Sequence, residues 1–525
     1  MSPVLTRRQA LAAAGAGWLT APAHSARRAP LQIVGPWELG GLSPAQSGHL
    51  YLRLQVAQTL LDAAPDGSPL PGLAAQWQVS EDGRQWQFRL HESRHFHDGT
   101  PVDAASVLPS LAAARVPPAL LSQAPIRELR AVASHTVQIT LTRPFAGLPA
   151  LLAHASAVVL APASRDGQGR VTQVIGSGPY RVVELSPPQR MVVAWAGAAG
   201  QPAPDVTEAH YLAAGRAETR ALMAAAGQAD LAFVLDPASV ARLRREAGTG
   251  GGVRLASTML PRVLLLKLNA GDARLADVRV RRALSLAIDR AGIAQALLRE
   301  PDLAANQLLP PMSFAWHRPG LPPLTQDLAH ARELLRQAGW QHQARNGEAG
   351  WLDAAGQPVK LTLRTFPDRP ELPLVATALQ AQWRALGVPV RVAIGNSGDI
   401  PLGHRTGSLQ LGLFARNYAT VPDPTATLAQ DFGRHGAAQG GDWGAMGWHH
   451  APTADALQAL LQGTADASRA AAWRAQVMTA LRDELPVIPI AWYRLQVAVS
   501  PRVGHVVLDP LERSYQLHQI RWRTS

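Results

Sequence analysis

Residues 91–95 read His-Glu-Ser-Arg-His, which matches the H-E-x-x-H zinc signature of metalloproteases. That chemistry needs a helix, because two histidines four residues apart must share one face to hold Zn²⁺ beside the basic glutamate. However, residues 84–90 alternate polar and apolar side chains like a half-buried strand, and residues 97–101 carry the Asp-Gly and Pro of a turn. We therefore predict a strand that leads into a turn. The alternative is a secreted zinc-dependent hydrolase that uses His91, Glu92 and His95.

The composition is that of a globular protein with more than one folded unit. The chain has 525 residues, of which 47% are hydrophobic and 17% are charged. Single cores seldom grow past about 250 to 300 residues, so two or three lobes are expected. The absence of cysteine excludes disulfides, cysteine-based zinc sites and thiol catalysis. The formal net charge is +12, but the arginines are scattered and few aromatic residues lie between them, so no nucleic-acid partner is expected.

The N-terminus has the pattern of an export signal. Arg7 and Arg8 precede a modest apolar run over residues 10–19, and small residues suited to a signal peptidase follow. The pattern predicts a twin-arginine signal over residues 1–26, with cleavage after Ala23 or Ala26. The protein is then expected in the periplasm, and the mature chain has no apolar stretch near the roughly 18 residues of a membrane span.

Strands and helices are expected to mix along the chain. Short β-type runs occur at residues 31–34, 86–90, 136–141 and 191–195, and apolar residues recur with helical spacing over residues 280–288 and 328–338. Gly339 can end the second of these helices. Because the elements do not alternate strictly, an α/β or α+β chain with more than one sheet is predicted.

Five segments resemble, in order, the motifs of one protein family. They are LAAQWQVSEDG with WQFRL and FHDGTPV over residues 73–102, GSGPY at 176–180, DVRVRRAL with AIDR over 277–290, DLAHARELLRQAGW at 327–340, and LPVIPI at 485–490. Together they resemble family 5 solute-binding proteins, the extracytoplasmic receptors of peptide and nickel ABC importers.

The motif residues themselves read as parts of the fold. His97 and Asp98 sit in a turn and are expected to brace the backbone rather than bind a metal. Arg279, Arg281 and Arg282 lie on a helix with an apolar stripe and are expected to be solvated charges on its outer face.

The resemblance implies a two-lobed, periplasmic-binding-protein-like α/β fold of type II, in the large peptide- and nickel-binding class, with a hinge between the lobes. We expect lobe one over residues 27–260, lobe two over 261–484 and a return to lobe one over 485–525. Residues 263–269 are the expected first crossing. Such a receptor closes like a hinge over its ligand and passes it to a membrane permease.

Residues 414–424 correspond to the segment that contacts ligand in peptide-binding members of the family. Those members place an aspartate four residues before the proline that ends the segment, where it pairs with the peptide's ammonium; here Thr420 stands in that place. A neutral hydroxyl loses the charge-assisted hydrogen bond, which argues against ordinary free-amine peptides. Asp423 could substitute, although an aspartate before proline more often shapes a turn. Arg416, in the same segment, is a further candidate.

The nickel branch fits this segment somewhat better. Tyr418 stands where that branch has an aromatic residue beside its chelated metal, and His435 lies close to the place of a histidine that reaches the metal; imidazole suits Ni²⁺. The arginines that hold the chelator in that branch would fall near Ala155 and Val158, and this sequence has no arginine at either position. His49 and His154 are nearby imidazoles of unknown orientation. His449 and His450 are a second metal candidate, although adjacent histidines on an exposed loop are the favoured interpretation.

These observations predict a non-catalytic receptor, expected to be a monomer, that binds a small peptide-like or metal-chelate solute. A nickel chelate would be its ligand rather than a cofactor. The expected ligand contacts are Tyr418, Thr420, Asp423, Arg416 and His49, with His435 as the metal candidate.

Overall fold

The computed structural model describes the chain over nine ranges: residues 29–197, 202–247, 252–313, 315–345, 348–367, 369–435, 438–439, 441–464 and 466–523. The predicted export signal, residues 1–26, lies outside them.

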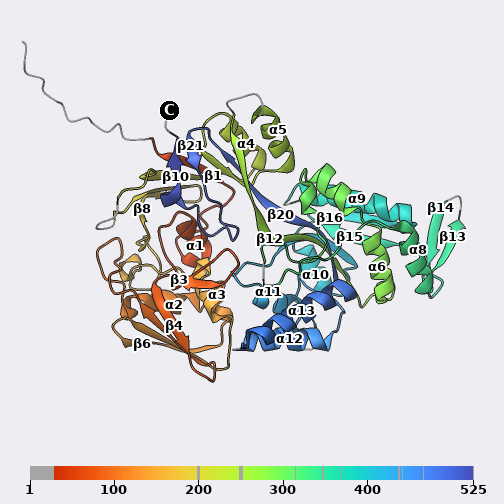
Figure 1. Ribbon diagram of the computed structural model, residues 1–525, viewed down its shortest axis with the longest axis horizontal. Coiled ribbons are helices and arrows are strands. Elements are labelled where there is room, and N and C mark those ends of the chain that lie inside the picture. Colours follow the sequence, from red (N-terminus) through yellow and green to blue (C-terminus); the bar gives the residue numbers. More distant parts are fainter. Residues whose placement is uncertain are drawn as a thin grey trace, which may run out of the picture.

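A ten-stranded mixed sheet runs through the molecule in the order β16-β15-β17-β12-β20-β11-β1-β10-β9-β8 (Figure 1). The strands are β1 (Leu31–Gly35), β8 (Tyr180–Ser186), β9 (Arg190–Trp195), β10 (Glu208–Ala213), β11 (Leu231–Phe233), β12 (Arg254–Leu268), β15 (Leu361–Thr365), β16 (Val390–Ile394), β17 (Leu411–Asn417) and β20 (Val487–Val499). A separate antiparallel sheet has the order β4-β5-β7-β6, with β4 (Ala74–Val79), β5 (Gln85–Leu90), β6 (Ile126–Ala133) and β7 (Thr136–Leu141). The four predicted strands correspond to β1, β5, β7 and β9 and are confirmed.

The two longest strands, β12 and β20, cross the middle of the molecule and connect its two halves (Figure 1). They pair antiparallel with each other, while β11 pairs with β20 on one side and β17 with β12 on the other. Their register shifts between Leu260 and Val263, where Pro261 has no N–H to donate to the ladder. The ladder is therefore interrupted where the chain passes from one half to the other.

Helices surround both halves. Those of the first half are α1 (Pro44–Arg53), α2 (Ala104–Ala114), α3 (Leu148–Leu152), α4 (Ala217–Ala225) and α5 (Pro237–Ala247). Those of the second are α6 (Val278–Leu286), α7 (Arg290–Gly292), α8 (Leu328–Gln337), α9 (Glu371–Leu386), α10 (Asp399–Arg405), α11 (Thr425–Phe432), α12 (Ala451–Gln462) and α13 (Ala467–Glu484). The remaining short strands are β2 (Leu61–Ala63), β3 (Pro69–Pro71), β13 (Gln341–Arg345), β14 (Glu348–Leu352), β18 (Arg434–His435), β19 (Ala438–Gln439), β21 (Val503–His505) and β22 (Arg521–Trp522). None of the helices within the described ranges is long and apolar enough to cross a membrane.

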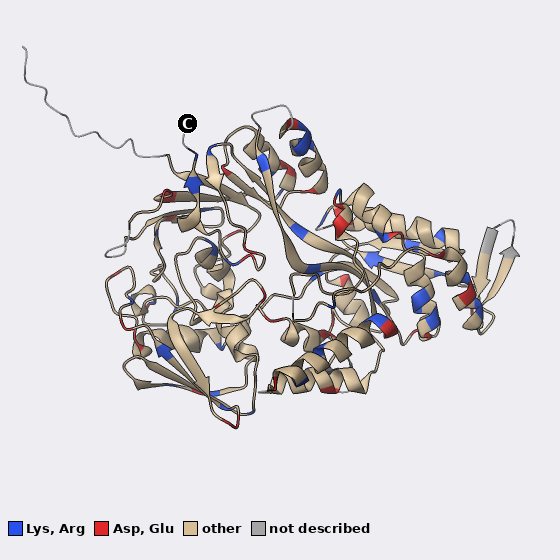
Figure 2. Cartoon of the chain, in the orientation of Figure 1, with Lys and Arg blue, Asp and Glu red and all other residues tan. Residues whose placement is uncertain are grey.

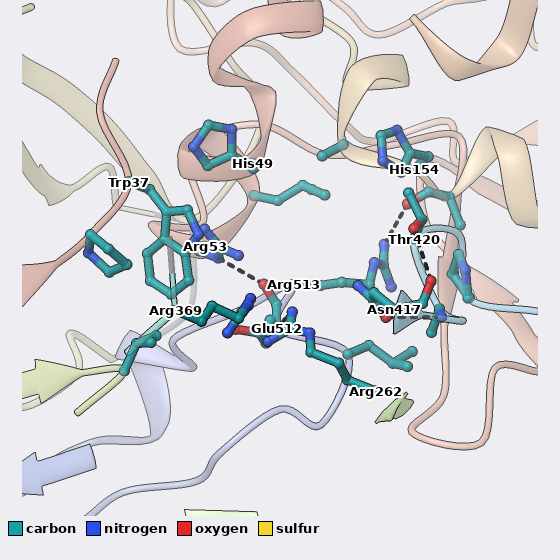
Figure 3. A pocket seen from close by; sticks show the side chains of 18 residues that line it. Trp37, His49, Arg53, His154, Arg262, Arg369, Asn417, Thr420, Glu512 and Arg513 are labelled. Carbon is teal, nitrogen blue, oxygen red and sulfur yellow. Dashed lines mark hydrogen bonds and ion pairs between the residues drawn. The ribbon is translucent and has the colours of Figure 1, made fainter. Parts of the chain in front are cut away.

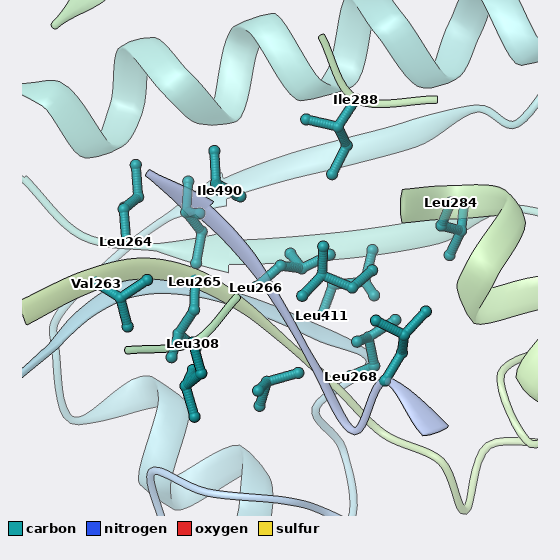
Figure 4. Close-up of a cluster of buried hydrophobic side chains, with 14 of the residues drawn as sticks. Val263, Leu264, Leu265, Leu266, Leu268, Leu284, Ile288, Leu308, Leu411 and Ile490 are labelled. Carbon is teal, nitrogen blue, oxygen red and sulfur yellow. The ribbon is translucent and has the colours of Figure 1, made fainter. Parts of the chain in front are cut away.

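The core of the second half forms around the inner end of β12 (Figure 4). Residues 263–268 are all fully buried, because helices and neighbouring strands cover both faces of this part of the sheet. Lys267 is the one cation in that run. Its Nζ lies 2.5 Å from His404 Nδ1 and donates to the Asp442 carbonyl at 2.7 Å.

One interpretation of the motif arginines was wrong. Arg281 is 2% exposed, and its guanidinium donates to the carbonyls of Leu275, Ala276 and Glu484 rather than facing water. Arg279 and Arg282 are exposed, as expected. The predicted apolar stripe over residues 280–288 extends beyond its helix. Helix α6 ends at Leu286, and the next two residues are still buried.

The family motifs brace the backbone as predicted. His97 Nε2 lies 2.8 Å from the Gly178 carbonyl, which ties the FHDGTP turn to GSGPY, and Asp98 accepts from the Thr100 N–H at 3.0 Å. Residues 91–95 form a turn after β5, where Glu92 pairs with Arg89 at 3.2 Å. A strand leading into a turn is therefore confirmed, and the helix that the zinc signature needs is not present at these residues.

Candidate ligand-binding cleft

A cavity of about 380 Å³ lies between the two halves, on one side of the crossing strands (Figure 3). This volume is in the range of small-molecule sites, roughly 300 to 1,000 Å³. The described residues that line it come from both halves: Pro36, Trp37, His49, Leu52, Arg53, Ala153, His154, Ala155, Val234, Arg262, Arg369, Asn417, Ala419, Thr420, Pro422, Leu511, Glu512 and Arg513.

Helix α1 presents Arg53 to the cavity from its last turn. Proline in the first turn of the helix fits, because its missing N–H has no helical acceptor there, and a cation suits the C-terminal end. The Arg53 guanidinium lies 3.6 Å from the Trp37 ring centroid, and its Nε donates to the Glu512 carbonyl at 2.8 Å. Its Nη1 is buried and has no hydrogen-bond partner within the described part of the chain.

The C-terminal segment adds Glu512 and Arg513. Asp509 orders this segment by accepting from the N–H groups of Leu511, Arg513 and Ser514 at 2.8, 3.0 and 3.0 Å. Arg513 pairs with Asp62 through Nη1 and donates from Nη2 to the Ala153 carbonyl at 2.9 Å. Its Nε is buried, again without a partner in the described ranges.

Two further arginines face the cavity from the crossing strand and the second half. Arg262, beside the interruption in β12, pairs with Glu512 at 3.0 Å. Arg369 lies just before α9, with its guanidinium 5.4 Å from the Tyr493 ring centroid. The cavity is therefore lined by four arginines and, among the residues described, one carboxylate, Glu512.

His49 and His154 are neutral at physiological pH. Burial, followed by the charge of Arg53, lowers the pKa of His49 to about 4, and burial with the charge of Arg513 lowers the pKa of His154 to about 4. His154 Nδ1 accepts from the Ser156 N–H at 3.1 Å, whereas His49 Nε2 is buried and has no partner among the residues that the structure covers.

A larger groove of about 1,170 Å³ opens beside the cavity. It runs between α4 and α5 on one side and the start of α9 on the other, and Tyr493 on its floor donates to Glu371 at 2.6 Å. Groove and cavity share the lining residues Pro36, Val234, Arg262, Arg369 and Glu512. The groove and the cavity therefore adjoin along these residues.

The two halves also touch one another directly. Val421 is 4% exposed and packs into the core beneath the four-stranded sheet of the first half. The Ala146 N–H donates to the Leu461 carbonyl at 2.7 Å, and the turn between β2 and β3 brings Gly67 against the Pro422 carbonyl. These contacts join the halves directly, in addition to the two crossing strands.

The structure brings some of the predicted residues into the cavity and others not. His49 and Thr420 line it. Arg416 and Tyr418 lie below it, where Arg416 makes a bidentate pair with the buried Asp431 at 2.8 and 2.7 Å. Tyr418 is 1% exposed, its hydroxyl also meets Asp431, and its N–H donates to the Pro261 carbonyl. Arg416 and Tyr418 therefore hold the segment that carries Thr420.

The remaining candidates have other roles or fall outside the description. Asp423 accepts from the Thr425 N–H at 2.6 Å at the start of α11, and His450 Nδ1 accepts from Thr453 N–H at 3.3 Å at the start of α12. His449 is exposed. The backbone of His435 is in β18, but its side chain lies outside the described residues. Within the described ranges, no three His, Asp or Glu side chains converge as metal ligands.

The sequence did not point to the cavity arginines. Arg53, Arg262, Arg369 and Arg513 come from four separate segments, and none stands in a motif. In Figure 2, lysine and arginine are spread over both halves, so no local concentration of basic residues marked the cavity.

Comparison with known proteins places the chain in a family. Residues 68–439 match the model of bacterial extracellular solute-binding proteins, family 5 Middle. The nickel-binding periplasmic protein of Escherichia coli K12 is 25% identical over 519 residues, covering 95% of each chain, and the dipeptide-binding protein of the same strain is 25% identical over 476 residues, covering 85% of each. A crystal structure of NikA from Brucella suis in complex with Fe(III)-EDTA superposes with a TM-score of 0.81 at 21% identity, over 94% of this chain and 100% of that one. The chain belongs to the bacterial extracellular solute-binding proteins of family 5.

Proposed function

We propose that this chain is the substrate-binding receptor of an ABC importer. It captures a small peptide-like or metal-chelate solute between its halves and delivers it to a membrane permease. The observation that carries the proposal is the cavity of about 380 Å³ walled by residues from both halves. A solute-binding protein changes no bond of its ligand, so a hydrolase role for His91, Glu92 and His95 is set aside.

The relatives support both ligand classes. They include a nickel-binding protein, a dipeptide-binding protein and a glutathione-binding protein, and a structural neighbour holds Fe(III)-EDTA. Their ligands are small and polar, which fits a cavity of this size with charged walls.

Capture works by hinge closure. We assign lobe one to residues 27–260 and 485–525 and lobe two to residues 261–484, with the interrupted stretch of β12 as part of the hinge. A bound ligand stabilises the closed state only through contacts that span both lobes. Thr420 and Arg369 of lobe two face His49, Arg53 and Arg513 of lobe one across the cavity, and these pairs supply such contacts.

The same proposal covers location and partners. A twin-arginine signal over residues 1–26 would bring the folded protein to the periplasm, where relatives with 25% identity function by name. There it acts as a monomer that docks on its permease.

Thermal unfolding of the mature protein against dipeptides, oligopeptides, opines and Ni²⁺-chelator mixtures tests the proposal. A ligand at 100 times its Kd adds about 2.7 kcal/mol to the free energy of unfolding, so the true cargo should raise the melting temperature. The exposed variant Arg391→Gln on β16 is the control and should respond like wild type. A broad panel without any response, or conversion of the cargo into product, would overturn the proposal.

A further inference from the structure

Two buried donor groups around the cavity, Arg53 Nη1 and Arg513 Nε, have no acceptor in the described part of the chain. The buried Nε2 of His49 also has no partner there, and it donates or accepts according to the tautomer of the neutral ring. A buried polar group left unsatisfied costs about 1 to 3 kcal/mol, more when it is charged. Arg53 is only 7% exposed, so water has little access to it. Other unpartnered nitrogens, such as Arg254 Nε, lie away from the cavity, whereas Arg53 and Arg513 line it, so there the missing acceptors can come from a ligand.

The charged side chains that line the cavity are mostly positive. Four arginines face one carboxylate, and that carboxylate, Glu512, is already paired with Arg262. Asp62, which does not line the cavity, pairs with Nη1 of Arg513. The Nε of Arg513 has no partner in the described residues. Among the described residues, no carboxylate forms an ion pair with Arg53 or Arg369, so the positive charge of the described wall is concentrated there.

The wall also lacks a place for a cation. Glu512 is committed to an arginine, and Thr420, across the cavity, offers a neutral hydroxyl whose Oγ1 contacts the Asn417 carbonyl at 3.4 Å. An ammonium group entering this cavity would lose its hydration and meet arginines instead of a carboxylate.

Building on the proposed receptor function, we infer that the cargo is a small anion without a free ammonium group, held through carboxylates by Arg53, Arg369 and Arg513 with His49 as a further partner. Arg53 and Arg513 lie on lobe one and Arg369 on lobe two, so an anion is also what allows like charges from the two lobes to approach. Carboxylates accept two parallel hydrogen bonds from one guanidinium, which gives such a contact both strength and direction.

One peptide in three charge states tests the inference by calorimetric titration. N-acetyl-Ala-Ala is an anion, Ala-Ala is a zwitterion and Ala-Ala-amide is a cation, while the backbone stays the same. Tricarballylate and the Ni²⁺–EDTA complex extend the anionic arm, and they distinguish a metal-free carboxylate from an anionic chelate. The anionic probes should bind, with affinity falling as salt rises, and the amide should not.

Arginine variants connect the binding to the cavity. Arg53→Gln and Arg369→Gln should each weaken the best anionic probe by at least ~10-fold, because each removes a charge-assisted hydrogen bond. Within the described residues, the Arg369 side chain makes no hydrogen bond to the backbone like that from Arg53 to the Glu512 carbonyl, so Arg369→Gln tests the idea even if Arg53→Gln unfolds. Arg391→Gln should bind like wild type.

The outcomes separate the inference from the function on which it rests. Binding of Ala-Ala or Ala-Ala-amide without binding of any anionic probe overturns the inference and leaves the receptor function standing. No response from any probe, or anion binding that both variants retain, also overturns the inference. If no probe binds and the wider solute panel also gives no response, the proposed receptor function is overturned as well.

Discussion

Two groups of buried arginines differ in how their donors are used. In the second half, Arg290 donates to the Pro489 carbonyl at 2.8 Å, to the Ser285 carbonyl at 2.9 Å and to Ser285 Oγ at 2.7 Å. Arg281 is likewise saturated by three carbonyls. At the cavity, Arg53 and Arg513 each keep one buried donor without an acceptor within the described residues. Burial alone therefore does not mark a cavity arginine. A buried donor without a partner also occurs away from the cavity, for example at Arg165 and Arg254, so it is the position of Arg53 and Arg513 in the cavity wall that distinguishes them.

The saturated group serves the fold. Burial lowers the pKa of Arg290 to about 9, which leaves it charged at neutral pH, and oriented carbonyl dipoles replace its hydration. It connects the end of α6 to β20. We propose that the cavity group serves a bound solute, whose acceptors would complete its hydrogen bonds only in the complex.

The largest expected effect comes from removing a saturated arginine. Arg290→Met leaves up to three buried acceptors without donors, and we expect it to lower the free energy of unfolding by about 3 kcal/mol or more. Urea unfolding measures this. Arg53→Gln should lower it by less, because Arg53 loses one hydrogen bond, to the Glu512 carbonyl, and its contact with the Trp37 ring. An equal loss of unfolding free energy in the two variants would contradict the distinction between saturated arginines and cavity arginines.

A contact between the lobes gives the next largest effect. Gly67 has φ +89, and a Cβ there would lie 2.3 Å from the Pro422 carbonyl oxygen. Gly67→Ala should therefore hinder closure and weaken binding of the best anionic probe by at least ~10-fold, because the clash exists only when the lobes meet.

Gly99→Ala is the matched control for this prediction. Gly99 has φ +85 but nothing within 4 Å of the added Cβ, so the variant carries the same backbone strain of about 1 kcal/mol without the clash. Calorimetry should show its affinity unchanged. If both variants bind alike, the contact between Gly67 and Pro422 does not accompany ligand binding.

A single carboxylate should change the preference of the cavity. Thr420→Asp adds a negative charge that can hold an ammonium and repel an anion, so we expect ~10-fold weaker binding of N-acetyl-Ala-Ala and measurable binding of Ala-Ala-amide. Thr142→Asp, at an exposed position of lobe one, should change neither affinity. Unaltered ligand preference in the Thr420 variant would mean that Thr420 does not face the ligand.

The smallest effect concerns Lys267, a saturated buried cation. Burial lowers its pKa from 10.5 to about 7, against the attraction of Asp431 and Asp442. Between pH 7 and 10.5 the unfolded chain therefore binds more protons than the folded one, and stability rises with pH by about 1 kcal/mol per unit just above pH 7. Lys267→Met should remove this rise in urea unfolding at pH 7 and 8. A variant with the wild-type slope would show that another group titrates there.

The sequence predicted the strands and the family well, because both depend on local patterns. Period-two alternation located β5, and Gly339 ended α8 as expected. Arg281 was misplaced because periodicity shows which face of a helix is apolar but not what covers the other face. Tyr418 and Arg416 were expected at the ligand. In the structure both contact the buried Asp431, fifteen residues beyond Arg416, and neither lines the cavity. The cavity arginines converge only through the tertiary fold, so spacing in the sequence could not reveal them.

The most direct test of the central claim is to identify what the cavity retains. Wild-type protein and Arg53→Gln are incubated with a bacterial small-molecule extract, separated from unbound solutes, denatured and compared by mass spectrometry. The account predicts a solute enriched on wild type alone that carries carboxylates and does not react with an amine-specific reagent. Enrichment of a solute with a free amine, or equal retention by both proteins, would contradict it.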